Sequence, residues 1–374
     1  MGKLVRALGL MSGTSMDGID VALIETDGEA DCRRLAAAST PYPPEFRVRL
    51  REALAAARVL EDRQERPAPL AAAEAELTRL HGEAVARFLR ARGLTAGDVG
   101  VIGFHGQTVL HRPERGLTVQ IGDGAALAGL TGVDVVYDLR AADVAAGGQG
   151  APLVPVYHRA LVARLPQRPV AVLNVGGVAN VTFVGRDDRL IAFDTGPGNA
   201  LIDDLMTTAL GQPCDEGGAL AGSGTVDQAA LAAYLTHDYF AAPPPKSLDR
   251  DAFSLAGVAG LPPADAAATL TAFTAAAVAR ARACLPEEPQ LWIVTGGGRR
   301  NRTLMRLLAA HVENAVAPAE AVGLDGDAME AEAWAYLAVR ALGGLALTFP
   351  GTTGVPQPTS GGVLARAPGR SASV

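Results

Sequence analysis

The chain repeats one local pattern, and this repetition limits its possible folds more than any other feature. Each copy is a pair of apolar strands joined by a turn of glycine and small polar residues, at residues 5–24 and again at 170–184, where residues 190–193 add a third strand. Apolar runs interrupted by glycine and by Asp or Asn are typical of β-hairpins. Ala- and Leu-rich segments that predict helices follow each copy, at residues 44–60, 70–92, 199–210, 263–285, 300–311 and 327–342.

Short apolar runs between these helices predict further strands at residues 100–104, 133–137 and 291–295. Hairpins followed by alternating strands and helices, twice over, predict an α/β protein with two related domains that face each other across a cleft. The length of 374 residues also suits two domains. We expect an N-terminal domain of residues 1–135, completed by residues 345–374, and a C-terminal domain of residues 136–344.

Composition and charge argue against several classes of protein. The chain is 49 % hydrophobic and 20 % charged, as globular proteins are. Its 33 basic and 40 acidic residues leave a net charge of −7, so we expect no nucleic acid as a partner. The longest uncharged helical stretch, residues 266–279, is too short to cross a bilayer, and no signal peptide precedes the first strand, so we expect no membrane partner and a cytoplasmic location. The widely spaced Cys32, Cys214 and Cys284 argue against a disulfide framework or a structural zinc site.

Lysine is rare, and its positions narrow the ways in which phosphate could be bound. Of 33 basic residues only Lys3 and Lys246 are lysines, and Lys246 follows three prolines rather than the glycines of a P-loop. Protein kinases need an interior strand lysine and a His-Arg-Asp loop, and pyridoxal enzymes need a Schiff-base lysine. A phosphate group would therefore be bound by glycines, helix ends and arginines.

The first hairpin turn, residues 13–20, has the composition of a phosphate-binding turn. Glycines near both ends allow a ligand to approach the backbone, Thr14 and Ser15 offer hydrogen-bond donors, and Asp17 could hold a metal ion. The alternative is an ordinary tight turn with capping hydroxyls. A second glycine hairpin leads into another acidic turn, and this repetition favours the interpretation of residues 13–20 as a phosphate-binding turn.

That acidic turn is Phe-Asp-Thr-Gly-Pro-Gly-Asn at residues 193–199. Asp194 ends an apolar strand, and Asn199 is a suitable N-cap for the next helix. A carboxylate in that position can bind magnesium or take a proton from a nucleophile. Asp-Thr-Gly also occurs in aspartic peptidases, which need two such carboxylates. The chain has one, so only a homodimer with both aspartates at its axis would fit that alternative.

A third signal is the run of three glycines at residues 296–298, between a strand and a helix. A helix entry turn needs one glycine, whereas three would let a planar ring or a phosphate approach the backbone. We expect Arg299 and Arg300, which follow, to be exposed.

Several other residues are weaker candidates. His105 follows a strand and precedes a glycine, which favours a place in a cleft, whereas we expect His111, His158 and His237 to be structural. Arg140 follows another strand, within residues 138–143, and residues 147–152 lead into a helix. Asp327 and Glu330 are three residues apart, which would place them on one face of a helix.

Together these segments resemble the anhydro-N-acetylmuramic acid kinase family. The resemblance rests on Gly-Leu-Met-Ser-Gly-Thr-Ser-Met-Asp-Gly-Ile-Asp, Phe-His-Gly-Gln-Thr, Gly-Gly-Gln-Gly-Ala-Pro-Leu-Val-Pro, Leu-Asn-Val-Gly-Gly-Val-Ala-Asn, Phe-Asp-Thr-Gly-Pro-Gly-Asn, Thr-Gly-Gly-Gly and Asp-Ala-Met-Glu-Ala. These motifs follow the family's order over nearly the whole chain. The family belongs to the sugar kinase/Hsp70/actin superfamily, which implies two related ribonuclease H-like domains, of the actin and hexokinase type, flanking a central cleft.

The resemblance also implies a reaction and a set of site residues. The enzyme would open the 1,6-anhydro ring of 1,6-anhydro-N-acetylmuramic acid with water and phosphorylate O6 with ATP and Mg²⁺, giving N-acetylmuramic acid 6-phosphate and ADP in peptidoglycan recycling. Asp194 would be the general base, Asp17 would bind Mg²⁺, and the enzyme would be a homodimer. ATP would be bound by Gly13, Thr14, Ser15, Met16, Asp17, Gly18, Ile19, Asp20, Gly176, Gly177, Gly296, Gly297 and Gly298, and the sugar by His105, Gln107, Arg140 and Glu330.

One segment departs from the family pattern. Where the family usually has Asp-Phe-Arg, often with further arginines, this chain has Asp-Leu-Arg followed by two alanines at residues 138–142. Arg140 is retained, but the positive lining expected for the lactyl carboxylate of the sugar is reduced. Two alternatives therefore remain: a kinase of a related anhydrosugar without the lactyl group, such as levoglucosan, and a non-catalytic, actin-like ATP sensor. The intact Asp194 disfavours the sensor, which would not need a base.

Overall fold

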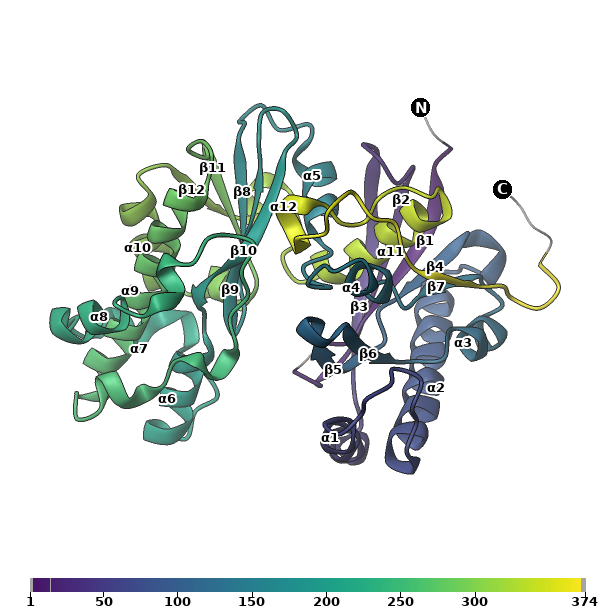
Figure 1. Cartoon of the computed structure of the whole chain (residues 1–374), viewed down its shortest axis with the longest axis horizontal. Helices are drawn as coiled ribbons and strands as arrows, with labels where there is room; N and C mark the ends of the chain where they lie inside the picture. The colour runs from purple at the N-terminus through teal and green to yellow at the C-terminus, as the bar shows by residue number, and fades with distance from the viewer. Residues whose placement is uncertain (1–2, 14, 371–374) are drawn as a thin grey trace. The chain divides into compact units, whose positions relative to one another are not determined.

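The computed structural model describes residues 3–13 and 15–370 and divides into two compact units (Figure 1). The first unit combines Met1–Ala163 with Ala328–Val374, and the second is Arg164–Asp327. Thr14, one of the residues expected to bind ATP, lies outside the described residues. In the described part of the chain, no helix has the length and apolar character required to cross a membrane.

The first unit is built on a six-stranded mixed sheet in the order β13-β7-β4-β1-β2-β3. Strands β1, β2 and β3 are antiparallel, whereas β4 and β7 run parallel to β1. A separate hairpin, β5–β6, extends from β4. The elements are β1 Val5–Met11, β2 Gly18–Thr26, β3 Cys32–Pro41, α1 Pro44–Ala57, α2 Ala68–Ala91, β4 Val101–Phe104, β5 Gln107–Arg112, β6 Leu117–Ile121, α3 Gly124–Thr131, β7 Val135–Tyr137, α4 Ala141–Ala145, α5 Pro155–Val162, α11 Met329–Leu342, α12 Pro350–Thr353 and β13 Val363–Ala365.

The second unit has a five-stranded mixed sheet in the order β10-β9-β8-β11-β12. Its first three strands are antiparallel, and β11 and β12 run parallel to β8. The elements are β8 Val170–Val175, β9 Val178–Val184, β10 Leu190–Pro197, α6 Ala200–Leu210, α7 Ala219–Ser223, α8 Gln228–Tyr234, α9 Pro263–Ala281, β11 Leu291–Thr295, α10 Arg302–Val312 and β12 Ala315–Pro318, with the short 3₁₀ helices η8 Gly297–Arg300 and η9 Ala319–Val322.

The two sheets share one topology. In each, the third, second and first strands form an antiparallel meander, and the fourth and fifth strands extend it in parallel from the first. The predicted α/β class with two related domains is therefore confirmed. Glycines end helices where the sequence indicated, since Gly93 lies just beyond the C-cap of α2 and Gly211 is the C-cap of α6, with left-handed φ values of 64° and 66°.

The division of the chain differs from the expected boundaries. Residues 136–163 and 328–344, which we expected in the second domain, lie in the first unit. The reason is packing: α11 lies against β1, β2 and β4, and β7 pairs with both β4 and β13. A helix that buries its residues on the first sheet belongs to that unit, although it follows the second unit in the sequence.

Two glycines allow α11 to pack directly on the first sheet. Gly9 of β1 and Gly103 of β4 are paired neighbours. A Cβ on Gly9 would lie 1.7 Å from the Ala331 carbonyl oxygen, and one on Gly103 would lie 1.9 Å from that of Trp334. The helix backbone therefore touches the strand backbones, and this contact determines where the side chains of α11 lie.

We expect Gly9→Ala to destabilise the first unit by at least about 3 kcal/mol, because the added methyl group has no space beside a rigid carbonyl. The measurement is urea unfolding followed by tryptophan fluorescence. Gly129→Ala is the matched control, because a Cβ there meets nothing within 4 Å in helix α3, so stability should rise by up to about 1 kcal/mol. Equal stability of the two variants would contradict the close packing of α11.

Candidate active site

The turn between β1 and β2 is anchored by the loop that follows β4. The Ser12 hydroxyl donates to the Gly106 carbonyl over 2.7 Å, and the Gln107 side-chain amide donates to the Gly13 carbonyl over 3.1 Å. Within the turn, the Met16 N–H donates to the same Gly13 carbonyl, and Met16 adopts a left-handed φ of 53°. Gln107 is only 1 % exposed, and its side chain is hydrogen-bonded to this turn.

The predicted ATP-binding residues of this turn differ in what they can offer. A Cβ on Gly18 would lie 2.4 Å from the Thr40 carbonyl, so strand packing already requires that glycine, whereas a Cβ on Gly13 would make only ordinary contacts of 3.7 Å or more. Ile19 is buried in the core, so only its backbone could meet a ligand. Asp17 is exposed and accepts a hydrogen bond from the Ser15 hydroxyl. The described residues contain no group of three or more His, Cys, Asp or Glu placed to hold a metal.

His105 is a neutral, buried side chain whose two ring nitrogens both have partners. Nδ1 lies 3.1 Å from the Ser12 carbonyl, which can only accept, and Nε2 lies 3.2 Å from the guanidinium of Arg140, which can only donate. Burial and, second, the Arg140 charge lower the pKa of His105 well below its usual value. His105 therefore supports Arg140 and the turn after β1.

Arg140 lies in a small cluster of the first unit. Its guanidinium also donates to the Gly150 carbonyl over 2.9 Å and lies 5.1 Å from the centre of the Trp334 ring. Burial lowers the pKa of Arg140 to about 10, so the side chain stays charged at neutral pH. The exposed Glu330 of α11 interacts electrostatically with it. The cluster thus offers one cation beside an aromatic face and a carboxylate.

Asp143 is a part of this region that the sequence analysis did not single out. It is 2 % exposed, and its two carboxylate oxygens accept hydrogen bonds of 2.6 Å from the Gly150 N–H and the Thr353 hydroxyl. It thereby holds the loop whose Gly150 carbonyl contacts Arg140. Nothing in the sequence marks this role, because Thr353 is 210 residues away.

In the second unit, four polar side chains form a row across the sheet. Asp194 of β10 pairs with Asn180 of β9, which pairs with Asn174 of β8, which pairs with Thr295 of β11. Their strand neighbours Leu173, Val175, Val181, Phe193 and Val294 belong to the core on the other face. The two asparagines were not predicted as site residues, although a polar residue inside an apolar strand was a usable signal.

Asp194 is held by the segment that follows the three prolines. The Leu248 N–H donates to Oδ2 over 2.7 Å, the Asp194 N–H donates to the Lys246 carbonyl over 3.0 Å, and the Tyr239 hydroxyl donates to the Asp194 carbonyl. Burial raises the pKa of Asp194 from its ordinary value of 3.8 to about 6, against a lowering by the Leu248 N–H. Leu248 is the one partner of this carboxylate among residues 3–13 and 15–370, so Oδ1 is available to accept a proton.

The turn between β8 and β9 is tied to the end of β10. The Gly198 and Asn199 N–H groups donate to the carbonyls of Gly177 and Gly176 over 2.9 and 2.7 Å. The side-chain amide of Asn199 donates to the Val175 carbonyl over 3.1 Å and makes no capping bond to α6. Asn199 therefore occupies the expected N-cap position of α6, but its side chain links two loops and does not cap the helix.

The three glycines after β11 have different surroundings. A Cβ on Gly296, which has φ +71°, would lie 2.4 Å from Asn174 Oδ1, and one on Gly298 would lie 2.5 Å from Val175 Cβ. Packing against β8 thus accounts for these two glycines. Gly297 is exposed, and a Cβ there would meet only the Asn199 amide at 3.4 Å, so Gly297 is the glycine that faces outward.

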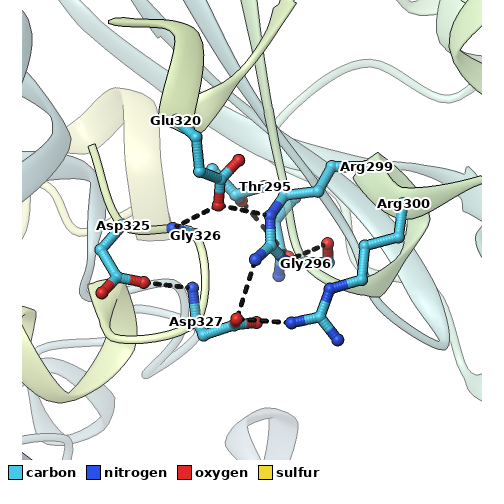
Figure 2. Close-up of polar contacts among 9 residues, drawn as sticks. Thr295, Gly296, Arg299, Arg300, Glu320, Asp325, Gly326 and Asp327 are labelled. Carbon is cyan, nitrogen blue, oxygen red and sulfur yellow. Dashed lines mark hydrogen bonds and ion pairs between the residues drawn. The ribbon is translucent and has the colours of Figure 1, made fainter. Parts of the chain in front are cut away.

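The expectations for the residues beside these glycines are corrected in two ways. Arg300 is exposed as predicted, but the Arg299 side chain is only 5 % exposed. Asp327 pairs with both arginines (Figure 2). It precedes α11, which begins at Met329, so Asp327 and Glu330 do not share a helical face as predicted.

Comparison with known proteins identifies the family. Residues 5–367 match the family described as anhydro-N-acetylmuramic acid kinase. The anhydro-N-acetylmuramic acid kinase of Rhizorhabdus wittichii is 58 % identical over 362 residues, covering 96 % of this chain and 98 % of the relative. That of Rhodopseudomonas palustris is 56 % identical over 369 residues, covering 97 % and 100 %. Among solved structures, a hexokinase of the ROK family from Thermus thermophilus is 17 % identical with a TM-score of 0.40, covering 89 % of this chain and 99 % of that one. On the evidence of its sequence relatives, the chain belongs to the anhydro-N-acetylmuramic acid kinase family.

Proposed function

We propose that this protein uses ATP to open the 1,6-anhydro ring of 1,6-anhydro-N-acetylmuramic acid and to phosphorylate O6, giving N-acetylmuramic acid 6-phosphate and ADP. The observation that carries the proposal is the environment of Asp194. A half-buried carboxylate with a pKa of about 6 and one oxygen bonded to a backbone N–H is suited to take a proton near neutral pH. Glycine turns lie near Asp194 in the sequence, and the sequence relatives are named anhydro-N-acetylmuramic acid kinases.

Asp194 would act as the general base for water. Oδ1 takes a proton while the water oxygen attacks the anomeric carbon, and the bond from that carbon to O6 breaks. O6 then attacks the γ-phosphorus of ATP, and ADP leaves with the electrons of the broken phosphoanhydride bond. The Leu248 N–H keeps Oδ2 occupied, so the carboxylate presents one fixed oxygen to the water.

ATP would be bound through backbone groups rather than by a lysine. Gly176 and Gly177 in the β8–β9 turn and the outward-facing Gly297 can offer N–H groups to phosphate or to the nucleoside. In the first unit, Gly13 is not closely packed and Ser15 is exposed, so the β1–β2 turn would contribute in the same way.

The sugar would be recognised by the cluster around Arg140. Its charge suits the lactyl carboxylate, and Glu330 can accept hydrogen bonds from hydroxyl groups. The Trp334 ring is only 1 % exposed, so it supports the guanidinium of Arg140 rather than meeting the sugar. His105 and Gln107 support this role indirectly, because their polar atoms contact Arg140 and the β1–β2 turn. A single arginine would be sufficient because Arg140, with a pKa of about 10, stays charged at neutral pH although burial lowers that pKa.

The Mg²⁺ that accompanies ATP would be held chiefly by the phosphates. Asp17 is an exposed oxygen donor beside the β1–β2 turn, which fits an ion that usually keeps several waters and takes one or two carboxylates. The ion would supply neutralisation of the phosphate charge. A cytoplasmic homodimer that serves peptidoglycan recycling completes the proposal, on the resemblance to the family.

The direct test is ADP release, in a coupled assay, with 1,6-anhydro-N-acetylmuramic acid, levoglucosan and N-acetylmuramic acid side by side. We expect turnover with the first compound alone, because only it has both the strained ring and the lactyl carboxylate. Turnover with levoglucosan instead would show that the substrate is an anhydrosugar without the lactyl group, and the assignment of Asp194 as the base would stand. Nucleotide binding without ADP release from any of the three would favour the sensor.

Replacement of Asp194 by Asn should lower kcat by about 10²–10⁴-fold and leave ADP binding unchanged, because the amide cannot take a proton. In the natural protein, kcat should fall as the pH drops below about 6, where the carboxyl becomes protonated. The measurement is a pH profile of kcat at saturating substrates. An Asp194→Asn enzyme with near-normal turnover would refute the assigned base.

The same substitution should stabilise the fold at neutral pH. A raised pKa means that the folded state holds the proton more tightly than the unfolded state, so stability falls as the pH rises from about 4 to about 6 and then stays level. We expect Asp194→Asn to be about 1–3 kcal/mol more stable than the natural protein at pH 8, with a smaller difference at pH 4. Denaturant titrations at the two pH values measure this; a difference that grows at low pH would contradict it.

A further inference from the structure

The Arg299 side chain is buried against the glycine turn that precedes it. Its Nη1 donates to the Gly296 carbonyl over 2.8 Å, its Nε donates to Glu320 Oε1 over 2.8 Å, and its Nη2 lies 2.9 Å from Asp327 Oδ2. Figure 2 shows the guanidinium between these two acids, with the Gly296 carbonyl on the side of the turn. Each of its three nitrogens therefore has a partner.

These partners come from separate parts of the second unit. Glu320 belongs to η9, which follows the edge strand β12, and Asp327 is the last residue of the unit. Glu320 Oε1 also accepts from the Gly326 N–H over 3.3 Å, and the Asp327 N–H donates to Asp325. The acids are thus held in place, and the guanidinium that joins them to Gly296 has one defined position.

The contact with Gly296 determines how the next peptide group points. In a trans peptide the carbonyl and the following N–H point in opposite directions. With the Gly296 carbonyl turned towards Arg299, the Gly297 N–H must point away from it. Gly297 is exposed, so a ligand could approach this peptide group. The φ of +71° at Gly296 requires glycine and leaves few other orientations of the turn.

Arg299 is not itself suited to bind phosphate. Two carboxylates neutralise its charge, and its side chain is only 5 % exposed. Arg300, the next residue, provides the contrast: it is 65 % exposed, pairs with the same Asp327, and has no described bond to Gly296. The adjacent arginines therefore share charge and one partner but differ in the contact with the turn.

We propose that Arg299 is a positioning residue for nucleotide binding, which orients the Gly296–Gly297 peptide so that the Gly297 N–H donates to the bound nucleotide. The proposal rests on the nucleotide role assigned to this turn under the proposed function. An arginine is needed because its planar fork reaches three acceptors in three directions at once, whereas a lysine ammonium at the same position could not hold all three.

The test compares Arg299→Lys with the matched control Arg300→Lys. Affinity for ADP is measured by calorimetry without sugar, and KM for ATP, KM for the sugar and kcat are measured in the ADP-release assay. We expect Arg299→Lys to weaken ADP binding and to raise KM for ATP by roughly ten- to hundredfold, as for loss of a hydrogen bond to a charged group. KM for the sugar and kcat at saturation should stay within about twofold. The control should match the natural protein in every quantity.

A second variant keeps the test decisive if Arg299→Lys does not fold. Glu320→Gln retains an acceptor but removes one charge that holds the guanidinium, so it should raise KM for ATP by a few fold and leave KM for the sugar unchanged. Unchanged ADP affinity in folded Arg299→Lys, or an equal loss in the Arg300 control, would overturn the inference. Failure of the proposed function looks different: the natural protein itself would not release ADP from the anhydrosugar, while the ADP-binding comparison would still test Arg299.

Discussion

The structure depends on backbone packed directly against backbone, on the central strands of the first sheet and in the loops beside the second. In the first unit, Gly9 and Gly103 let the carbonyls of α11 lie where side chains would otherwise be. In the second, a Cβ on Gly198 would lie 2.2 Å from the Gly176 carbonyl, and one on Gly296 would lie 2.7 Å from that of Val175. Because these groups have no room to shift, they give the neighbouring side chains and N–H groups a fixed base, and long-range hydrogen bonds such as that from the Leu248 N–H to Asp194 complete their support.

Burial disfavours the charged forms of the candidate site residues. Burial raises the pKa of Asp194 and lowers those of Arg140 and His105. For Asp194 this brings the pKa of the carboxyl group closer to neutral pH, where the proposed general base would be most effective. For Arg140 the ordinary value is so high that the charge survives, and for His105 the neutral ring becomes an acceptor for the arginine. The same physical effect thus gives a carboxyl group with a pKa of about 6, a cation and a neutral support.

Much of the fold follows from local pattern. Strand β11 has the predicted bounds, Leu291–Thr295, because an apolar run between a polar turn and a glycine permits few other structures. Helix α11 begins two residues later than predicted, and its unit was predicted wrongly, because its apolar residues show that it is buried but not on which sheet. Asn174 and Asn180 could have been found as polar positions in apolar strands, whereas Asp143 could not, since its partner Thr353 is 210 residues away.

By itself, the sequence determined the repeated hairpins, the α/β class, the glycine turns and the family, because these depend on residue type and on spacing over short distances. Only the tertiary structure decided which glycines are already required by packing, that the side chain of the N-cap residue Asn199 links two loops, and that Arg299 is buried while Arg300 is exposed. The physical reason is that burial and hydrogen-bond partners are properties of neighbours in space. Two adjacent arginines are identical in local sequence terms, and they differ only in which of them meets Glu320 and the Gly296 carbonyl.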